Sequence, residues 1–369
     1  MREPSSDEGR PARGADVMSR ILLPQEWSGW PRRNPPQRRK AAPPGTARRV
    51  TLVTPSYNQD RFLEETILSV LNQDYPNLEY MVFDGGSTDR TREILEQYGS
   101  RLAYWESKPD RGQAHAINKG WAKATGDYVW WLNADDLLAP EALWISVASL
   151  ETHPEADLAY GDLINIEEDG RYLDSRPSPE FELDRSISEG FPVAQAGALM
   201  RRQVLDRIGF LDEDLHYLMD ADYWLRLALS GGRLIRVPQV VALFRVHGRA
   251  KTQTGSMAAI RERYALNERL FARPDLPEAV RAHRARSTSR MHLACARGYL
   301  KLGEYRMSLR EVGRAARTWP GRLLDPFLWW HLFLGLVGVV VGERAWLRLR
   351  GLLRRARRMR PGSRRQHLE

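Results

Sequence analysis

The sequence predicts an α/β fold with a doubly wound, mostly parallel sheet, on the basis of three observations in residues 50–132. Short runs rich in β-branched and aromatic residues alternate four times with segments whose apolar residues recur at helical spacing. The links between them are short, which is typical of parallel strands joined by helices. Polar clusters follow three of the four strand-like runs, so we expect a binding site outside the carboxyl ends of the strands.

Each of these elements has its own local signal. Apolar residues recur at helical spacing after the first strand, as Leu63 and Ile67 show. The second helix is expected to begin near Thr88 or Asp89, because both side chains cap helix N-termini well. The third helix is expected at 113–124. The four predicted strands are 50–54, 78–83, 102–106 and 128–132.

After residue 139 the pattern becomes mixed. One strand is expected at 158–166, one helix at 221–230 and a pair of short strands at 234–245. From 257 to about 319 the apolar periodicity is helical, with two amphipathic segments that resemble a helical hairpin.

Composition divides the chain of 369 residues into four parts. A tail rich in Pro, Arg, Gly and Ser precedes the first strand, and we expect it to be flexible and basic. The α/β domain follows, then the helical hairpin region, and finally an apolar helix with a second basic tail. In residue numbers, the four parts are 1–49, 50–252, 253–322 and 323–369.

The apolar run at 326–342 predicts contact with a membrane surface. Its length is at the lower limit for crossing a bilayer, so spanning, lying in the interface and burial in protein all stay open. Trp329 and Trp330 near one end and the arginine-rich flank at 344–365 favour membrane contact. Because the N-terminus lacks an export signal and Cys295 is the single cysteine, we expect the cytoplasmic face of the inner (plasma) membrane.

Two neighbouring carboxylates end the fourth predicted strand. Asp135 and Asp136 follow the apolar run 129–132, and burying such charges is costly unless something compensates them. Mg²⁺ or Mn²⁺ would do so, since these ions bind a few carboxylates together with substrate phosphate oxygens. An exposed acidic cap before Pro140 would explain the same residues, so both interpretations stay open here.

Asp84 ends the second predicted strand in a glycine-rich turn. Its carboxylate is suited to accept a hydrogen bond from the imide N–H of a uracil or thymine ring. Gly85 and Gly86 would let the backbone approach a nucleotide closely. An ordinary turn with a helix cap, for which Thr88 and Asp89 suffice, is the alternative.

Taken in order, these segments resemble the family 2 glycosyltransferases, which have the GT-A fold. The similarity runs from about residue 50 to residue 252, and its specificity comes from the order and spacing of the motifs rather than from any one of them. The motifs are TPSYN at 54–58, DGGSTD at 84–89, DRGQ at 110–113, AINKG at 116–120, NADD at 133–136, DADYWLR at 220–226 and RVH at 245–247.

The resemblance implies an inverting, metal-dependent glycosyltransferase of the hexosyltransferase type. Such an enzyme moves a sugar from a nucleotide-diphosphate sugar, such as a UDP-sugar, to a saccharide or lipid-linked acceptor in cell-surface polysaccharide synthesis. By their motif positions, Asp135 and His247 would hold Mn²⁺ or Mg²⁺. The residues implied in donor binding are Pro55, Ser56, Tyr57, Asp84, Asp110, Arg111, Asn118, Asp136 and Arg245.

Asp220 falls where the family has its general base, and Asp222 is the alternative. Many relatives have Glu-Asp where this chain has Met219-Asp220, so Asp222 is possible, but the position in the motif favours Asp220. The metal motif also departs from the family, because it begins with Asn133 in place of Asp. Asp135 is then the expected carboxylate ligand of the metal.

Other classes of protein fit the sequence less well. A sugar-nucleotide nucleotidyltransferase would share the sheet, but a glycine-rich loop with arginine and lysine is expected after its first strand, and the loop here is PSYNQ at 55–59. The net charge of +9 suits a nucleic-acid-binding protein, yet the arginines flank the core and no nucleic-acid-binding motif is found, so we expect no nucleic acid partner. A degenerate transferase is disfavoured by retention of the motif carboxylates. The segment 191–200 is expected to set acceptor selectivity.

Overall fold

The computed structural model describes residues 47–251, 256–337 and 339–340. Its centre is a nine-stranded sheet with the order β3-β2-β1-β4-β8-β6-β9-β5, in which β7 pairs with β6 beside this path. The strands are β1 (Val50–Ser56), β2 (Leu78–Asp84), β3 (Tyr104–Ser107), β4 (Tyr128–Trp131), β5 (Leu137–Leu138), β6 (Leu158–Glu167), β7 (Tyr172–Arg176), β8 (Ala198–Arg201) and β9 (Leu234–Val246).

Helices cover the sheet and form a separate group after it. The α-helices are α1 (Leu63–Leu71), α2 (Thr91–Tyr98), α3 (Gln113–Lys123), α4 (Ala142–Thr152), α5 (Leu183–Glu189), α6 (Gln203–Ile208), α7 (Met219–Leu229), α8 (Met257–Ala272), α9 (Glu278–Ala282), α10 (Arg284–Lys301) and α11 (Tyr305–Thr318). The short 3-10 helices are η3 (Gly99–Arg101), η4 (Gln195–Gly197) and η5 (Pro320–Leu324). Residues 326–337 are also helical.

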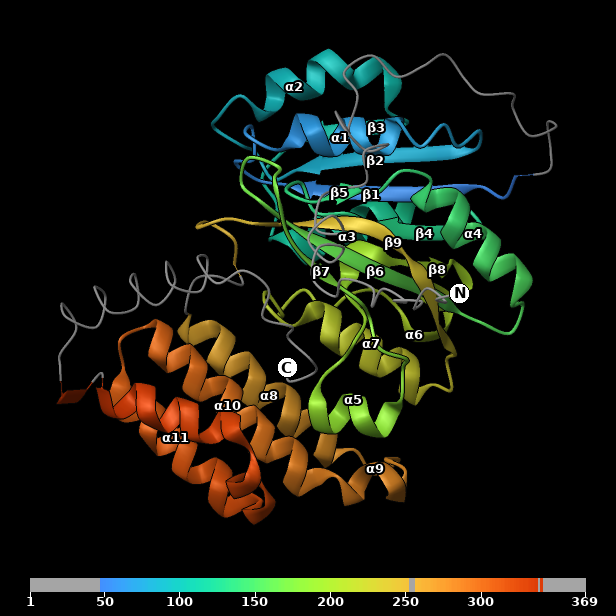
Figure 1. Cartoon of the computed structure of the whole chain (residues 1–369). Coiled ribbons are helices and arrows are strands. Elements are labelled where there is room, and N and C mark those ends of the chain that lie inside the picture. The colour runs from blue at the N-terminus through green and yellow to red at the C-terminus, as the bar shows by residue number, and fades with distance from the viewer. Residues whose placement is uncertain (1–46, 252–255, 338, 341–369) are drawn as a thin grey trace, which may run out of the picture.

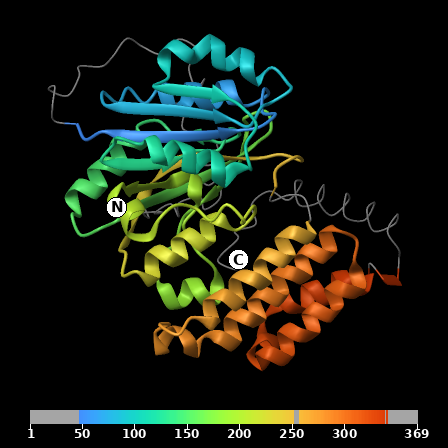
Figure 2. The same ribbon diagram turned by 180° about the vertical axis from the view of Figure 1, so that it is seen from behind.

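The sheet occupies the upper part of the molecule in Figure 1, and α8 to α11 are grouped below it. Helices α5 and α7 lie between the sheet and this group, as the view from behind in Figure 2 also shows. Helix α10 packs against both α5 and α8. The helical region therefore adjoins the part of the α/β domain that carries the predicted base segment.

The sheet is mixed, which corrects the prediction of a mostly parallel sheet. Strands β3, β2, β1 and β4 run parallel, as the short links of residues 50–132 indicate. Strand β8 then pairs antiparallel with both β4 and β6, and β5 and β7 are antiparallel to their partners. The prediction rested on the regular alternation of residues 50–132, and the strands that join the sheet after residue 139 include the antiparallel β7 and β8.

The segment 234–245, predicted as a pair of short strands, is part of the single strand β9. It pairs in parallel with β6, and the register shifts beside Gly161 and Asp162. Residues 238 and 239 have no partner in that register, so Pro238 sits where its missing N–H breaks no ladder bond. The strand then continues to Val246, and its pairing with β5 places the next residue, His247, near the segment after β4.

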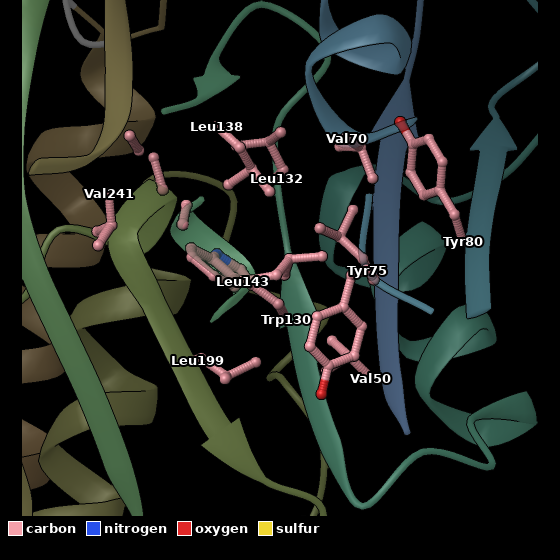
Figure 3. Packing of buried hydrophobic residues seen from close by; sticks show 14 of the residues in the cluster. Val50, Val70, Tyr75, Tyr80, Trp130, Leu132, Leu138, Leu143, Leu199 and Val241 are labelled. Atoms are coloured by element: carbon pink, nitrogen blue, oxygen red, sulfur yellow. The ribbon is translucent and has the colours of Figure 1, made fainter. Parts of the chain in front are cut away.

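Strand β4 separates two hydrophobic clusters, because successive side chains of a strand point to opposite faces of the sheet. On one face Trp130 packs with Leu143 and Val241, as Figure 3 shows. On the other face Trp131 stacks on Trp224, with 5.4 Å between the ring centroids. Both tryptophans of β4 are buried, so they pack the core on either side of the strand.

The apolar segment that begins at residue 326 is described only in part. Its helix packs on the helical region, where Leu328 lies in one cluster with Leu293 of α10 and Val312 of α11. Among the described helices, none combines the length and the hydropathy that crossing a bilayer requires. Of the two predicted basic tails, residues 1–46 and 341–369 lie outside the described part of the chain.

Candidate active site

The loops after β1 and β2 meet at the carboxyl ends of these parallel strands. Ser56 pairs with Asp84 at the end of the ladder. Beyond this pair, the N–H of Asn58 donates to Oγ of Ser87 at 2.7 Å, so the two loops are tied to each other. Tyr57 lies at the start of the first loop with 61% of its surface exposed. The segments predicted to hold the nucleotide base are thus brought together at one edge of the sheet.

The carboxylate of Asp84 and the hydroxyl of Ser56, both at this edge, differ in their hydrogen bonds. The buried carboxylate of Asp84 accepts from the N–H of Ser87 at 2.9 Å and from the hydroxyl of Ser107 at 2.7 Å, so its orientation is held. The buried hydroxyl of Ser56 has no hydrogen-bond partner among the described residues. A buried polar atom without a partner is costly. Ser56 therefore offers a group that a bound ligand can satisfy.

Asp110 lies directly against the glycine-rich turn. A Cβ at Gly85 would come within 3.1 Å of both carboxylate oxygens of Asp110, so a larger residue there would displace the carboxylate. The N–H of Gly112 donates to Oδ1 of Asp110 at 2.8 Å and orients it. This geometry brings the loop before α3 next to the loop after β2.

Arg111 and Asn118 are linked through Glu213. Nε of Arg111 donates to Oε2 of Glu213 at 3.0 Å, and Nδ2 of Asn118 donates to Oε1 of the same carboxylate at 3.1 Å. Burial alone would raise the pKa of Glu213, but the hydrogen bonds from Asn118 and Arg111 lower it. Asn118 also exchanges two hydrogen bonds with the backbone of Leu211. Its amide is therefore occupied in positioning Glu213 and, through it, Arg111.

The two carboxylates after β4 have different surroundings. Asp135 Oδ2 lies 3.0 Å from Nε2 of His247, and 21% of the Asp135 side chain is exposed. Asp136 is buried and accepts the N–H of Arg245 at 3.0 Å. Burial, and after it the carboxylate of Asp135, raises the pKa of Asp136 well above its ordinary value. Asp135 is the carboxylate available to a ligand, and Asp136 belongs to the interior.

Arg245 is a buried link between segments far apart in the chain. Its guanidinium donates to the carbonyl oxygens of Asp135 and Glu168, both at 3.0 Å, and to Oε2 of Glu65 at 2.6 Å. It also lies over the ring of Phe62, 4.9 Å from the centroid. These contacts hold the loop after β4 against α1 and β9. The predicted contact of Arg245 with the donor stays a prediction.

The Asp135–His247 pair matches the protein ligands of a divalent ion that is shared with a substrate. One carboxylate oxygen and one imidazole nitrogen lie side by side, and Mg²⁺ takes one or two protein ligands together with phosphate oxygens. Within the described ranges, no group of three or more His, Cys, Asp or Glu residues is arranged to hold a metal by itself. The pair therefore fits an ion whose remaining ligands come from a diphosphate.

A chain of polar side chains that the sequence did not predict lies beside this pair. Nζ of Lys251 donates to Oε1 of Gln113 at 2.9 Å, and Nε2 of Gln113 donates to Oδ1 of Asn133 at 2.6 Å. Asn133 in turn donates to Gln195 at 3.3 Å. Burial lowers the pKa of Lys251, while the carboxylates of Glu262 and Asp135 oppose that shift. The only sequence signal for Lys251 is its place four residues after the RVH motif.

The structure distinguishes the two candidates for the general base. Asp222 is buried and pairs with Arg226, whose Nε lies 2.8 Å from Oδ2, so its charge is compensated. Asp220 accepts the N–H of Ala221 at 2.8 Å, and no ion pair to it is found among the described residues. Burial raises the pKa of Asp220, and the nearby Arg263 guanidinium only partly opposes it. A partly accessible carboxylate with a raised pKa is the better proton acceptor, so the geometry favours Asp220.

The segment that leads into Asp220 is held by the helical region. The buried carboxylate of Glu262, on α8, accepts the backbone N–H groups of His216, Tyr217 and Leu218 at 2.7–3.1 Å. These are the residues immediately before α7, whose first turn carries Asp220. Glu262 is therefore a positioning residue for the candidate base, and no motif in the sequence marks it.

Comparison with known proteins assigns the family. A family model described as glycosyl transferase family 2 matches residues 51–209. EpsE of Bacillus subtilis (strain 168), named as a glycosyltransferase, is 30% identical over 195 residues, which cover 50% of this chain and 68% of EpsE. The chain belongs to glycosyltransferase family 2. This confirms the resemblance seen in the motifs, and it disfavours a nucleotidyltransferase or a nucleic-acid-binding protein.

Two further relatives define how far the similarity reaches. An uncharacterized glycosyltransferase of Rickettsia typhi is 30% identical over 216 residues, covering 56% of this chain and 66% of the relative. TuaG of Bacillus subtilis (strain 168), whose name assigns it to teichuronic acid biosynthesis, is 41% identical over 90 residues, covering 24% of this chain and 36% of TuaG. The chain thus spans about two thirds of the length of EpsE and the Rickettsia protein.

Solved structures show the same fold. TarS 1–349 from S. aureus in complex with UDP-GlcNAc matches with a TM-score of 0.57 at 20% identity, over 74% of this chain and 82% of that chain. The mannosyltransferase PcManGT from Pyrobaculum calidifontis in complex with GDP-Man and Mn²⁺ matches with a TM-score of 0.54 at 22% identity, over 83% and 90%. The fold is GT-A-like, with a mixed sheet and a helical C-terminal region.

The contact of Glu262 with the backbone before α7 predicts that this residue controls turnover. Glu262→Ala removes the acceptor of three N–H groups, and we expect the displaced base to lower kcat about 100-fold while the KM for the donor stays unchanged. Glu262→Gln keeps an acceptor oxygen and is expected to recover part of kcat. Steady-state kinetics of both variants, with Glu268→Gln on an exposed position of α8 as the matched control, provide the measurement. Unchanged kcat in Glu262→Ala would contradict the positioning role.

Proposed function

We propose that this protein is an inverting glycosyltransferase that moves a sugar from a nucleotide-diphosphate sugar to a hydroxyl of a saccharide or lipid-linked acceptor. The observation that carries the proposal is the Asp135–His247 pair at 3.0 Å, placed on the same sheet edge as the nucleotide-binding motifs. The names of TuaG and EpsE, and the donors bound by TarS and PcManGT, support this class of reaction. We also propose a role in cell-surface polysaccharide synthesis, which the name of TuaG supports.

Donor recognition divides between the two ends of the site. At the nucleotide end, Ser56 supplies a free hydroxyl, Tyr57 an exposed ring and Asp84 an oriented carboxylate for a uracil imide. At the other end, Asp110 and the Glu213-held Arg111 would contact the sugar and the diphosphate. Pro55 precedes this set at the end of β1 and fixes the backbone there.

Charge on the leaving diphosphate needs compensation from fixed cations. Asp135 and His247 would hold Mn²⁺ or Mg²⁺, and the ion when bound neutralises the negative charge of the diphosphate. The ammonium of Lys251 is close enough to Asp135 for each to act on the other electrostatically, so it places a protein cation on the same side. Arg111 supplies a second one from the loop before α3. This arrangement stabilises charge that develops during transfer.

Asp220 supplies the base. Its carboxylate would accept the proton of the acceptor hydroxyl as that oxygen attacks the anomeric carbon and the bond to the diphosphate breaks. One displacement of this kind inverts the anomeric configuration. No second carboxylate nucleophile is required, in contrast to retaining glycosidases.

The donor and the two carboxylates are tested together. The purified protein is incubated with UDP-, GDP- and dTDP-sugars plus Mn²⁺ or Mg²⁺ and an acceptor panel, and release of nucleoside diphosphate is followed. We expect release from one donor, reduced about 100-fold or more in Asp220→Asn and at least about tenfold in Asp135→Ala. Asp222→Asn is the matched control on the same helix. Full activity of Asp220→Asn, or no binding of any nucleotide-sugar, would contradict the proposal.

The same variant makes a prediction about pH. A base must be deprotonated, so the rate is expected to rise with pH through the raised pKa of Asp220, and this limb should vanish in Asp220→Asn. A carboxyl whose pKa is raised on folding destabilises the folded state once the pH exceeds its unfolded value. Asp220→Asn is therefore expected to be at least as stable as the wild type at neutral pH, by thermal unfolding. A less stable variant would show that lost activity reflects lost structure.

We further propose that the helix at 326–337 attaches the protein to the cytoplasmic face of the inner membrane. Its exposed apolar residues Trp329, Phe333 and Leu336 recur at helical spacing and form one stripe, while Leu328 and His331 on the other side are buried. The arginine-rich sequence at 344–365 follows directly. An apolar stripe beside a basic segment is suited to a bilayer with anionic headgroups.

Vesicle binding tests this attachment. The full chain is expected to sediment with phosphatidylglycerol-containing vesicles, less with pure phosphatidylcholine, and to lose most binding when Trp329 and Phe333 are both replaced by Ser. Leu173→Ser removes an exposed apolar side chain from β7 and serves as the control. If the double variant binds as the wild type does, the stripe is not the attachment surface.

A further inference from the structure

Several arginines gather where the helical region meets the α/β domain. Arg263 lies on α8, Arg286, Arg290 and Arg297 lie on α10, and Arg322 lies on η5. Burial lowers the pKa of Arg290 to about 10, and the guanidinium groups of Arg263, Arg322 and Arg297 lower it further in the same direction. Arg290 nevertheless remains accessible to solvent. The cluster is therefore a positively charged part of the surface rather than a closed core.

Three members of this cluster have partners. Nη2 of Arg286 lies 2.6 Å from Oε1 of Glu189, and Nη1 of Arg322 lies 2.9 Å from Oδ2 of Asp325. Arg297 stacks over a ring, 5.1 Å from the centroid of Phe327. Each of these arginines thus has a structural reason to be where it is.

Arg263 and Arg290 are different. Neither makes a hydrogen bond or an ion pair with any described residue. The guanidinium groups of Arg263, Arg322 and Arg297 act on Arg290, and the carboxylate of Glu189 opposes them only in part. Like charges close to one another repel, and water and salt reduce this repulsion without removing it. A bound anion would relieve this repulsion. The planar guanidinium fork matches phosphate oxygens better than any other cationic side chain does.

The two arginines lie near different segments of the α/β domain. Arg263 directly follows Glu262, and its guanidinium is close enough to Asp220 to act on that carboxylate. The Arg290 guanidinium lies on the backbone of Gly190, which has a φ of 110°; a Cβ there would overlap it. Gly190 is the residue before the segment 191–200, for which the sequence predicts a role in acceptor selectivity.

We propose that Arg263 and Arg290 form a subsite for a phosphate group of the acceptor, which places the acceptor hydroxyl at Asp220. The acceptor is then a phosphate-bearing saccharide, either lipid-linked through a diphosphate or free. This inference rests on the proposed function and narrows it to one class of acceptor.

Binding of inorganic phosphate tests the subsite directly. The full chain is first saturated with UDP and Mg²⁺, so that the donor diphosphate site is filled, and phosphate is then titrated by calorimetry. Arg263→Gln and Arg290→Gln are each expected to bind phosphate at least about tenfold more weakly than the wild type. Arg261→Gln, which removes the same charge from an exposed position of α8, should bind as the wild type does. Equal binding by all four proteins, or none by the wild type, would overturn the proposal.

A second arm identifies the source of the phosphate. Transfer is compared between one saccharide with a polyprenyl diphosphate, the same saccharide with a simple phosphate, and the neutral saccharide. The KM for the phosphate-bearing forms is expected to rise about tenfold in Arg263→Gln and Arg290→Gln, with the dissociation constant of the donor unchanged. Preference for either phosphate form supports the subsite and names its ligand. Equally efficient use of the neutral saccharide by the wild type would overturn it.

The two proposals fail in different ways. If the wild type binds no nucleotide-sugar, the proposed transferase activity is wrong. If it binds a donor and transfers sugar, but the arginine variants keep the phosphate affinity and the acceptor KM of the wild type, only the subsite is wrong.

Discussion

The arrangement of the site depends on how two neighbouring carboxylates are held at the end of a buried strand. Asp136 is inside the protein and is tolerated there because the backbone N–H of Arg245 donates to it. The guanidinium of Arg245 in turn binds the carbonyl oxygen of Asp135 and reaches Glu65 on α1. Strand β9 pairs with β5 next to these contacts, and His247, which follows β9, therefore lies beside the carboxylate of Asp135. Without these contacts, the buried carboxylate of Asp136 would lose its donor, and the two candidate metal ligands, Asp135 and His247, would separate.

The position of the candidate base also depends on the contact between the sheet domain and the helices that follow it. The backbone before α7 has three N–H groups that end on one carboxylate of α8, that of Glu262. The helical region is thus part of the candidate active-site scaffold, and it also supplies Arg263 near the candidate base and Arg290 at Gly190. A family model that ends at residue 209 does not include these elements. They are a natural place for acceptor preference to vary while donor chemistry is retained.

Local patterns were sufficient to predict part of this structure. The parallel strands β1 to β4 and the loops at their carboxyl ends follow from alternation and turn residues. The mixed half of the sheet does not, because β8 has only four residues and its direction is decided by pairing with β4 and β6, which are distant in sequence. Inside the site, too, the contacts of a residue depend on segments that are distant in sequence, and a motif does not reveal them. The motif predicts that Asn118 binds the donor, and this stays a prediction; the structure adds that its amide binds Leu211 and Glu213. The motif favours Asp220 over Asp222, and the contact of Asp222 with Arg226 adds an argument that the sequence does not contain. Lys251 and Glu262 carry no motif at all.

The most direct test of this account is the coordination of Mn²⁺ in the presence of UDP, followed by electron spin echo spectroscopy. The Asp135–His247 geometry predicts a nitrogen coupling from one imidazole, which disappears in His247→Ala, together with loss of Mn²⁺ affinity in Asp135→Ala. His115→Ala, at the start of α3, should leave both signals unchanged. Tight Mn²⁺ binding with no nitrogen coupling, or binding that survives in Asp135→Ala, would show that the ion is held elsewhere and would contradict the site described above.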